Sequence, residues 1–242
     1  MPVCFLACMP LVLGACTTPR VSGPLQPPGV ESGVRMDRVF DESRPLRVWR
    51  GELVVGNVHR DIDLWREVTG STDRGTHRAH AFVKERQTPD GDTRVVHEVE
   101  FDFDQDHNVF MTRVTEPRRN LDVHFEPPLL VARGFMRAGE NLDSRTEARV
   151  MDTRRPDEIK YAGTARQRVQ LRSTEEGLEL RSELLIDLGL PTLRVRSRLV
   201  LDCTRPDMPF AKKEVTDALV KVGIAPVLRE KRDLAWVGDD LK

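Results

Sequence analysis

The sequence predicts a mainly β protein: a curved antiparallel sheet, half-barrel or barrel-like, with one or two short helices. Several segments alternate apolar and polar residues with the period of two that is typical of strands with one buried face. Short turn sequences rich in Gly, Pro, Asp and Asn separate these segments, and helical periodicity is confined to two places. A single sheet of eight or more strands has to curl or fold over to protect its edges, which favours the curved form.

A short apolar run at the start of the chain, Val3 to Leu13, ends in the four residues Leu13-Gly14-Ala15-Cys16. The run is too short to cross a bilayer, because a spanning helix takes about 20 apolar residues. Together with its small residues it resembles a lipobox, the signal at which bacterial lipoproteins are cleaved and acylated. The resemblance implies a signal peptide over residues 1–15 and lipid on Cys16. No Lys or Arg precedes the run, so either the true start lies upstream or the amino terminus alone supplies the positive charge.

The lipobox resemblance also implies a location. Several acyl chains on one cysteine hold a protein durably on a membrane, here in the cell envelope. The residue after Cys16 is Thr17 and not Asp, which implies the outer membrane facing the periplasm over the inner membrane. The membrane is therefore the first expected partner.

The segment after Cys16 is rich in Pro, Gly and Ser, and it has too little apolar content to bury. Residues 16–43 are accordingly predicted to be the lipidated N-terminus and a flexible tether. Order is expected to begin near residues 44–48, and residues 44–242 are expected to form a single antiparallel β domain. Cys203 falls within this domain, where a free cysteine is expected to pack as a small buried apolar residue.

Strands are predicted in order along the domain. The first one ends at Gly56, and the clearest hairpin joins residues 79–84 to residues 93–104 through the turn sequence Thr88-Pro89-Asp90-Gly91-Asp92. In its second strand, one face is predicted to carry Val95, His97, Val99, Phe101 and Phe103. Further strands are predicted over residues 108–115, 121–125, 147–151, 159–171, 178–188 and 192–201.

Helical spacing occurs near residues 209–222. Pro209 suits a first helical position, Gly223 suits a stop, and the apolar residues at i, i+3, i+4 and i+7 are Val215, Ala218, Leu219 and Val222. A C-terminal helix is therefore predicted. Residues 57–70 fit either a helix capped by Asn57 or a strand in which Ile62, Leu64, Arg66 and Val68 alternate, and the helix is slightly favoured.

No motif for catalysis or metal binding stands out. Gly-x-Ser-x-Gly, Ser-x-x-Lys and phosphate-binding glycine loops are absent from the sequence, so we expect neither an enzyme nor a cofactor. Asp102-x-Asp104-x-Asp106 resembles the start of a calcium loop, but His107 and Arg113 occupy the positions that need Gly and an acidic residue. The histidines lack zinc spacing, and a net charge of −1 gives no overall attraction to nucleic acid.

Arginines occupy the outward positions of two predicted strands, at residues 166, 168, 172, 194, 196 and 198. Such a patch is suited to phosphate or an acidic glycan. The alternative is cross-strand pairing with Glu179, Glu183 and their neighbours, which is favoured about three to one.

Residues 127–140 hold a dense apolar group with a double proline and two glycines, outside the clean alternation. They suit a loop folded over a concave sheet, in which the mouth of a ligand cavity is lined by Leu129, Leu130, Phe135 and Met136. The alternative is a crossover that merely covers the core, which is favoured about two to one.

The chain, with its lipobox, its tether and its antiparallel meander, resembles bacterial lipoproteins of the LolA/LolB type. The resemblance concerns the predicted architecture of residues 44–240 and involves no shared motif. Those proteins have a curved sheet whose hollow is closed by helices and binds acyl chains. The resemblance implies a non-enzymatic envelope module that binds a lipid or other amphiphilic ligand inside its sheet. The alternative is a structural or interaction lipoprotein that has a filled interior and docks an envelope partner; a packed core and a surface patch would distinguish it from a carrier.

Overall fold

The computed structural model describes residues 33–36, 46–72, 79–87, 94–117, 120–202 and 210–240. The regular elements in these ranges are all strands: β1 (Gly33–Arg35), β2 (Leu46–Val55), β3 (Val58–Thr72), β4 (Ala79–Gln87), β5 (Arg94–Phe103), β6 (Val109–Glu116), β7 (Leu121–Ala132), β8 (Phe135–Arg137), β9 (Asn141–Asp152), β10 (Arg155–Thr174), β11 (Gly177–Asp187), β12 (Thr192–Asp202), β13 (Phe210–Val222) and β14 (Ala225–Asp240).

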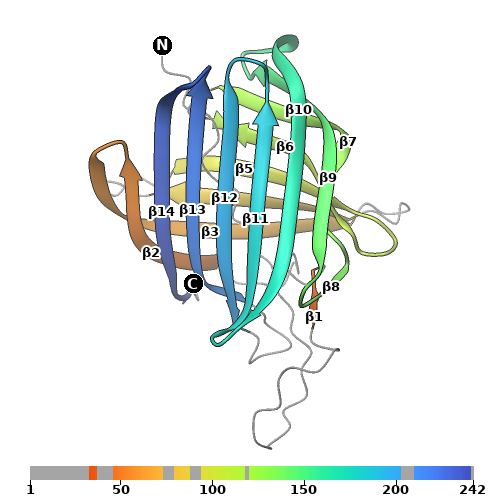
Figure 1. The fold of residues 1–242 in the computed structure, drawn as a ribbon, viewed down its shortest axis with the longest axis vertical. Coiled ribbons are helices and arrows are strands. Elements are labelled where there is room, and N and C mark those ends of the chain that lie inside the picture. The colour runs from red at the N-terminus through yellow and green to blue at the C-terminus, as the bar shows by residue number, and fades with distance from the viewer. Residues whose placement is uncertain are drawn as a thin grey trace, which may run out of the picture.

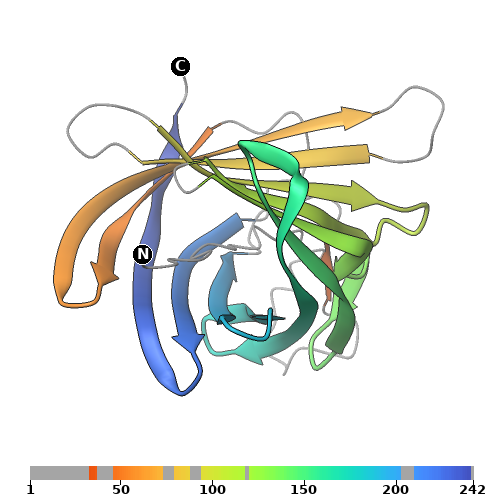
Figure 2. The same cartoon turned by 90° about the horizontal axis from the view of Figure 1, so that it is seen from above.

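The predicted curved antiparallel sheet is confirmed. Twelve strands pair in the order β10-β11-β12-β13-β14-β2-β3-β4-β5-β6-β7-β9, and β9 pairs in turn with β10, so the pairing closes on itself. Strands β9 to β14 form one face of the molecule and β3 to β7 lie behind it (Figure 1). Seen from above, the β2–β3 hairpin projects on the side where β14 meets β2 (Figure 2).

The space inside the sheet is filled by one hydrophobic core, to which almost every long strand contributes alternate residues. The predicted face of residues 95–103 points inward: His97, Val99, Phe101 and Phe103 are all buried. Strand β11 is equally regular, because its alternate residues from Leu178 to Ile186 are buried while the residues between them are outward. The largest fully buried side chains include Trp49, Phe101, Met36, Leu64 and Met111.

The predicted C-terminal helix near 209–222 is wrong. Residues 210–222 form β13, which pairs along its length with β12 and β14. Its inward residues are Glu214, Thr216, Ala218 and Val220, so two of the four buried positions are polar. The apolar residues alone therefore matched helical spacing by coincidence, and pairing on both sides determines the structure.

The slightly favoured helix over residues 57–70 is also wrong, and the strand alternative is confirmed. Val55 and Val58 are paired residues at the ends of β2 and β3, so the turn has only two residues, Gly56 and Asn57. Gly56 has a φ of 60°, which glycine adopts without strain. Gly-Asn between two apolar segments is a hairpin signal that the sequence contained.

The segments at residues 33–36 and 127–140 differ from expectation. Order was expected to begin near residue 44, but β1 pairs with β8 and both Val34 and Met36 are fully buried. The predicted loop over residues 127–140 is wrong over most of its length, because β7 continues to Ala132 and residues 135–137 form β8. Its apolar residues therefore belong to β7 and to the two-stranded sheet of β1 and β8.

A bidentate ion pair joins β6 and β7, and it should make stability fall in acid. Arg113 Nε and Nη2 donate to Asp122 over 2.7 and 2.6 Å. Burial raises the pKa of Asp122, but hydrogen bonds from Arg113 and His124 leave it below its usual value. The folded state then binds this proton less readily than the unfolded chain, so the stability from ionised Asp122 is present above about pH 4 and is lost as pH falls through the folded pKa.

The measurement is urea unfolding between pH 7 and pH 2 of the wild type and of Asp122→Asn. We expect the variant to be less stable at pH 7 by about 1–3 kcal/mol and the two curves to converge in acid. A constant difference across the whole range would contradict the assignment.

Candidate functional site

The outer face of β9 to β14 carries three rows of side chains that cross the strands at matching register. The first, which we call the mixed row, alternates in charge: Asp143, Arg168, Glu183, Arg196, Asp217 and Lys231. The second, the arginine row, consists of Arg145, Arg166, Leu185, Arg194, Leu219 and Arg229. The third, the polar row, lies on the other side of the mixed row and consists of Asn141, Gln170, Arg181, Arg198, Val215 and Asp233.

A hollow of about 540 Å³ lies between the mixed row and the polar row, and every member of both rows except Asp233 lines it. We call it the basic groove. Its lining also includes Leu142, Val169, Ser182 and Ser197, which occupy the strand positions between the two rows. The basic groove therefore crosses the strands. Further hollows of about 480 and 200 Å³ are lined by members of the arginine row.

The acidic members of the mixed row each hold arginines in place. Arg166 forms a bidentate contact with Asp143, Arg229 Nη2 donates to Asp217 over 2.9 Å, and Arg196 Nε donates to Glu183 over 2.8 Å. Arg194 also approaches Glu183, at 3.6 Å. The hydrogen bond from Arg166 lowers the pKa of Asp143 from its usual value.

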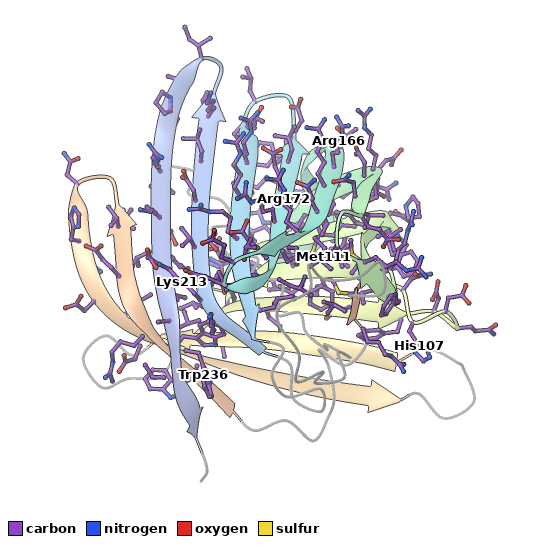
Figure 3. The ribbon with its side chains drawn as sticks, turned by 60° about the horizontal axis from the view of Figure 1, so that its bottom comes forward. His107, Met111, Arg166, Arg172, Lys213 and Trp236 are labelled. Carbon is purple, nitrogen blue, oxygen red and sulfur yellow. The ribbon has the colours of Figure 1, made fainter. Side chains whose placement is uncertain are left out.

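Cross-strand pairing, the alternative for the predicted arginine patch, is therefore realised in part. Two other contacts run along a single strand: Arg172 donates to Gln170 on β10, and Arg181 pairs with Glu179 on β11. Figure 3 shows Arg166 on the outer side of the molecule.

Positive charge nevertheless exceeds negative charge on this face. The three rows contain nine basic side chains and four carboxylates. Arg145, Arg198 and Lys231 form no ion pair with any residue in the described ranges. Two pairs of arginines also lie directly opposite each other on neighbouring strands, Arg145 opposite Arg166 and Arg181 opposite Arg198. Like charges in this position destabilise a sheet.

A buried polar network lies on the inner side of the same strands. Ser182, Ser197, Thr216 and Arg232 are cross-strand neighbours in that order. Gln167 Nε2 donates to Ser182 Oγ over 2.7 Å, Thr216 Oγ1 donates to Glu214 Oε1 over 2.9 Å, and Arg232 Nε donates to Glu230 Oε1 over 3.0 Å. Burial lowers the pKa of Arg232 to about 10, so its guanidinium is charged at neutral pH.

The residues predicted to line a cavity mouth are not brought together as one surface. Leu129 and Met136 are buried in the core, Leu130 packs against the core, and Phe135 is exposed. They belong to β7 and β8, and none of them lines the basic groove. Cys16, predicted to carry lipid, and Cys203 lie outside the described residues.

The residues of the basic groove were only partly visible in the sequence. The outward arginines of β10 and β12 were identified, but Asp143, Asp217 and Lys231 belong to strands whose register the sequence did not show. Within the described ranges, no three His, Cys, Asp or Glu side chains are placed to hold a metal ion, and no helix is long and apolar enough to cross a membrane.

Comparison with known proteins adds no relative. The chain matches no protein-family model, and neither the curated proteins nor the solved structures contain a match.

Proposed function

We propose that this chain is a non-enzymatic envelope lipoprotein, anchored through lipid on Cys16 to the outer membrane, that binds an extended anionic ligand in the basic groove. The observation that carries the proposal is the placement of Arg181 directly opposite Arg198, at the edge of a groove with an excess of cations. Like charges in this position destabilise a sheet, and the carboxylate of Glu179 pairs with Arg181 but not with Arg198. An anionic ligand between the two guanidinium groups would turn the repulsion into attraction.

The ion pairs of the mixed row support the same ligand class, because they fix the orientation of its cations before a ligand binds. A guanidinium has five N–H donors, and Arg196 uses its Nε on Glu183. Its remaining donors are available for phosphate or carboxylate oxygens, which guanidinium groups bind through paired hydrogen bonds. A side chain already held by a carboxylate loses less freedom when it binds.

The spacing of the cations favours a long ligand over a single ion. In the mixed row the basic residues are Arg168, Arg196 and Lys231, on the alternate strands β10, β12 and β14. Neighbouring strands lie about 4.8 Å apart, so a cation recurs about every 10 Å across the sheet. An acidic glycan or another chain with repeated anionic groups would meet these cations in turn.

A ligand inside the sheet, the first expectation from the sequence, has less support. The described inward side chains pack into one continuous core, which favours the alternative of a filled interior. The groove on the outer face is the better place for a ligand, and its cations favour an acidic one.

The proposal predicts that removing two unpaired cations weakens binding without weakening the fold. In Arg198→Gln/Lys231→Gln, the affinity for dextran sulfate should fall by about tenfold or more, because two charge-assisted contacts are lost. Thermal stability should stay constant or rise slightly, because Arg198 no longer repels Arg181. The measurements are titration calorimetry at about 0.15 M salt, where exposed charges are substantially screened, and thermal unfolding.

The matched control is Arg133→Gln/Arg154→Gln, which removes the same charge at two exposed positions outside the basic groove. It should bind dextran sulfate almost as the wild type does, and uncharged dextran should bind to none of the three proteins. Equal loss of affinity in both double variants would mean that only net charge matters, and the groove assignment would then be wrong.

A further inference from the structure

Apolar side chains project from the tips of two neighbouring hairpins. Ile224, in the two-residue turn between β13 and β14, is 99% exposed, and Leu190, in the turn between β11 and β12, is 64% exposed. Val222 and Val227 flank Ile224 and are 43% and 42% exposed. None of these residues supports the core, so their apolar character has no structural cause within the described residues.

The two tips lie side by side at one end of the sheet. Thr192, at the start of β12, pairs with Lys221, near the end of β13, so the turns that hold Leu190 and Ile224 are adjacent. Both project at the top of the molecule (Figure 1). The β10–β11 turn, which holds Glu176, lies at the opposite end of the same strands.

The two charged residues in the segment around Ile224 are both positive. From Ala218 to Arg229 the chain contains Lys221 and Arg229 and no carboxylate. Arg229 is held by Asp217 further down the sheet, whereas Lys221 is exposed. The second tip carries one carboxylate, Asp187, which accepts a hydrogen bond from the backbone N–H of Gly189.

We propose that these two hairpin tips insert into the surface of an anionic lipid bilayer. Exposed apolar residues beside a cation, here Lys221, suit interfacial membrane binding, in which apolar groups enter the boundary of headgroups and acyl chains while cations contact anionic lipids. The proposal goes beyond the groove function and does not depend on it, because the tips and the basic groove share no residue.

The shape of the tips favours a bilayer over a protein partner. Ile224 and Leu190 stand on separate convex turns, and a protein would need a matched pocket for each of them. A fluid bilayer adapts to any protrusion, so the side chains can be buried without such complementarity. Gly223, with a φ of 63°, keeps the β13–β14 turn to two residues and thereby leaves Ile224 at its extreme.

The test uses the full chain with Cys16→Ser, so that no acyl chain is attached, and vesicles of phosphatidylcholine with phosphatidylglycerol. A tryptophan introduced by Ile224→Trp should be quenched by brominated acyl chains. The matched control is Glu176→Trp, which places the same probe on an exposed turn at the opposite end and should not be quenched beyond the parent chain. Quenching at position 224 alone would support the proposal; equal quenching at both positions, or none at either, would overturn it.

A second measurement is affinity for the same vesicles. Ile224→Asp should bind these vesicles more weakly by about tenfold or more, because burial of this one apolar side chain in the bilayer is lost. Its thermal stability should stay the same, because the residue is exposed. Unchanged vesicle affinity would overturn the proposal, as would a concentration-dependent dimer that Ile224→Asp abolishes, since the tips would then bind a second copy of the chain. Arg198→Gln/Lys231→Gln should keep the quenching at position 224, so failure of the groove and failure of the tips remain distinguishable.

Discussion

Replacing Arg232 with alanine is expected to lower the free energy of unfolding by about 3–5 kcal/mol, because it leaves a buried carboxylate without its cation. Arg232 and Glu230 are both buried and are joined by a 3.0 Å hydrogen bond. Burial lowers the pKa of Arg232 only to about 10, so the guanidinium is fully charged at pH 7 and its loss removes a whole positive charge from the interior. Urea unfolding followed by circular dichroism at pH 7 measures the effect.

The control removes both charges together. Glu230→Gln/Arg232→Met should recover most of the loss, because replacing a buried ion pair with uncharged side chains of similar volume is often neutral or stabilising. If the double variant is as unstable as Arg232→Ala alone, then shape rather than charge explains the loss. A loss below about 1 kcal/mol for Arg232→Ala would contradict a buried pair.

Trp49→Ala is expected to cost about 3–5 kcal/mol, the range for removing a buried aromatic side chain. Trp49 is fully buried and is among the largest side chains of the core. It lies on β2 between Leu64 of β3 and Trp236 of β14, where the first long strand of the chain meets the last. The variant would therefore open a cavity at this junction. Chemical unfolding with guanidinium measures the difference from the wild type.

Two further variants test the reason for that loss. Trp49→Phe keeps most of the apolar volume and should lose clearly less than Trp49→Ala. Leu190→Ala removes an exposed apolar side chain and should change stability by less than about 0.5 kcal/mol. Comparable losses for Trp49→Phe and Trp49→Ala would indicate that an interaction of the indole, and not its volume, stabilises the junction.

Most of the sheet was predictable because its strands bury apolar residues at every second position. Residues 95–103 and 192–201 are such segments, and their buried faces match the sequence pattern. Strand β13 was missed because Glu214 and Thr216 occupy inward positions. These two polar residues belong to the buried polar network, and they interrupt the alternation of apolar and polar residues by which a strand is recognised. A local pattern cannot show that a polar side chain will find partners on strands distant in sequence.

The candidate site was less predictable than the sheet, because it depends on register. The outward arginines at 166, 168, 194 and 196 follow from alternation within two strands. Their alignment with Asp143 on β9 and Asp217 on β13 depends on the register between neighbouring strands. Turn lengths and core packing set that register, and neither can be read from the sequence of one strand alone. Arg198 was recognised as outward, but only the register places Arg181 opposite it.

The pairing of β2 with β14 has a consequence for how the protein is made. Val55 pairs with Glu230, so the first long strand has no neighbour on one side until almost the whole chain has been synthesised. During that time β2 presents an unpaired strand edge, to which other chains can add. Contacts so distant in sequence also slow folding. A chain truncated before residue 225 would expose the edges of both β2 and β13 permanently and should aggregate, whereas a cut at an exposed turn such as 175–176 would leave every strand present and able to pair.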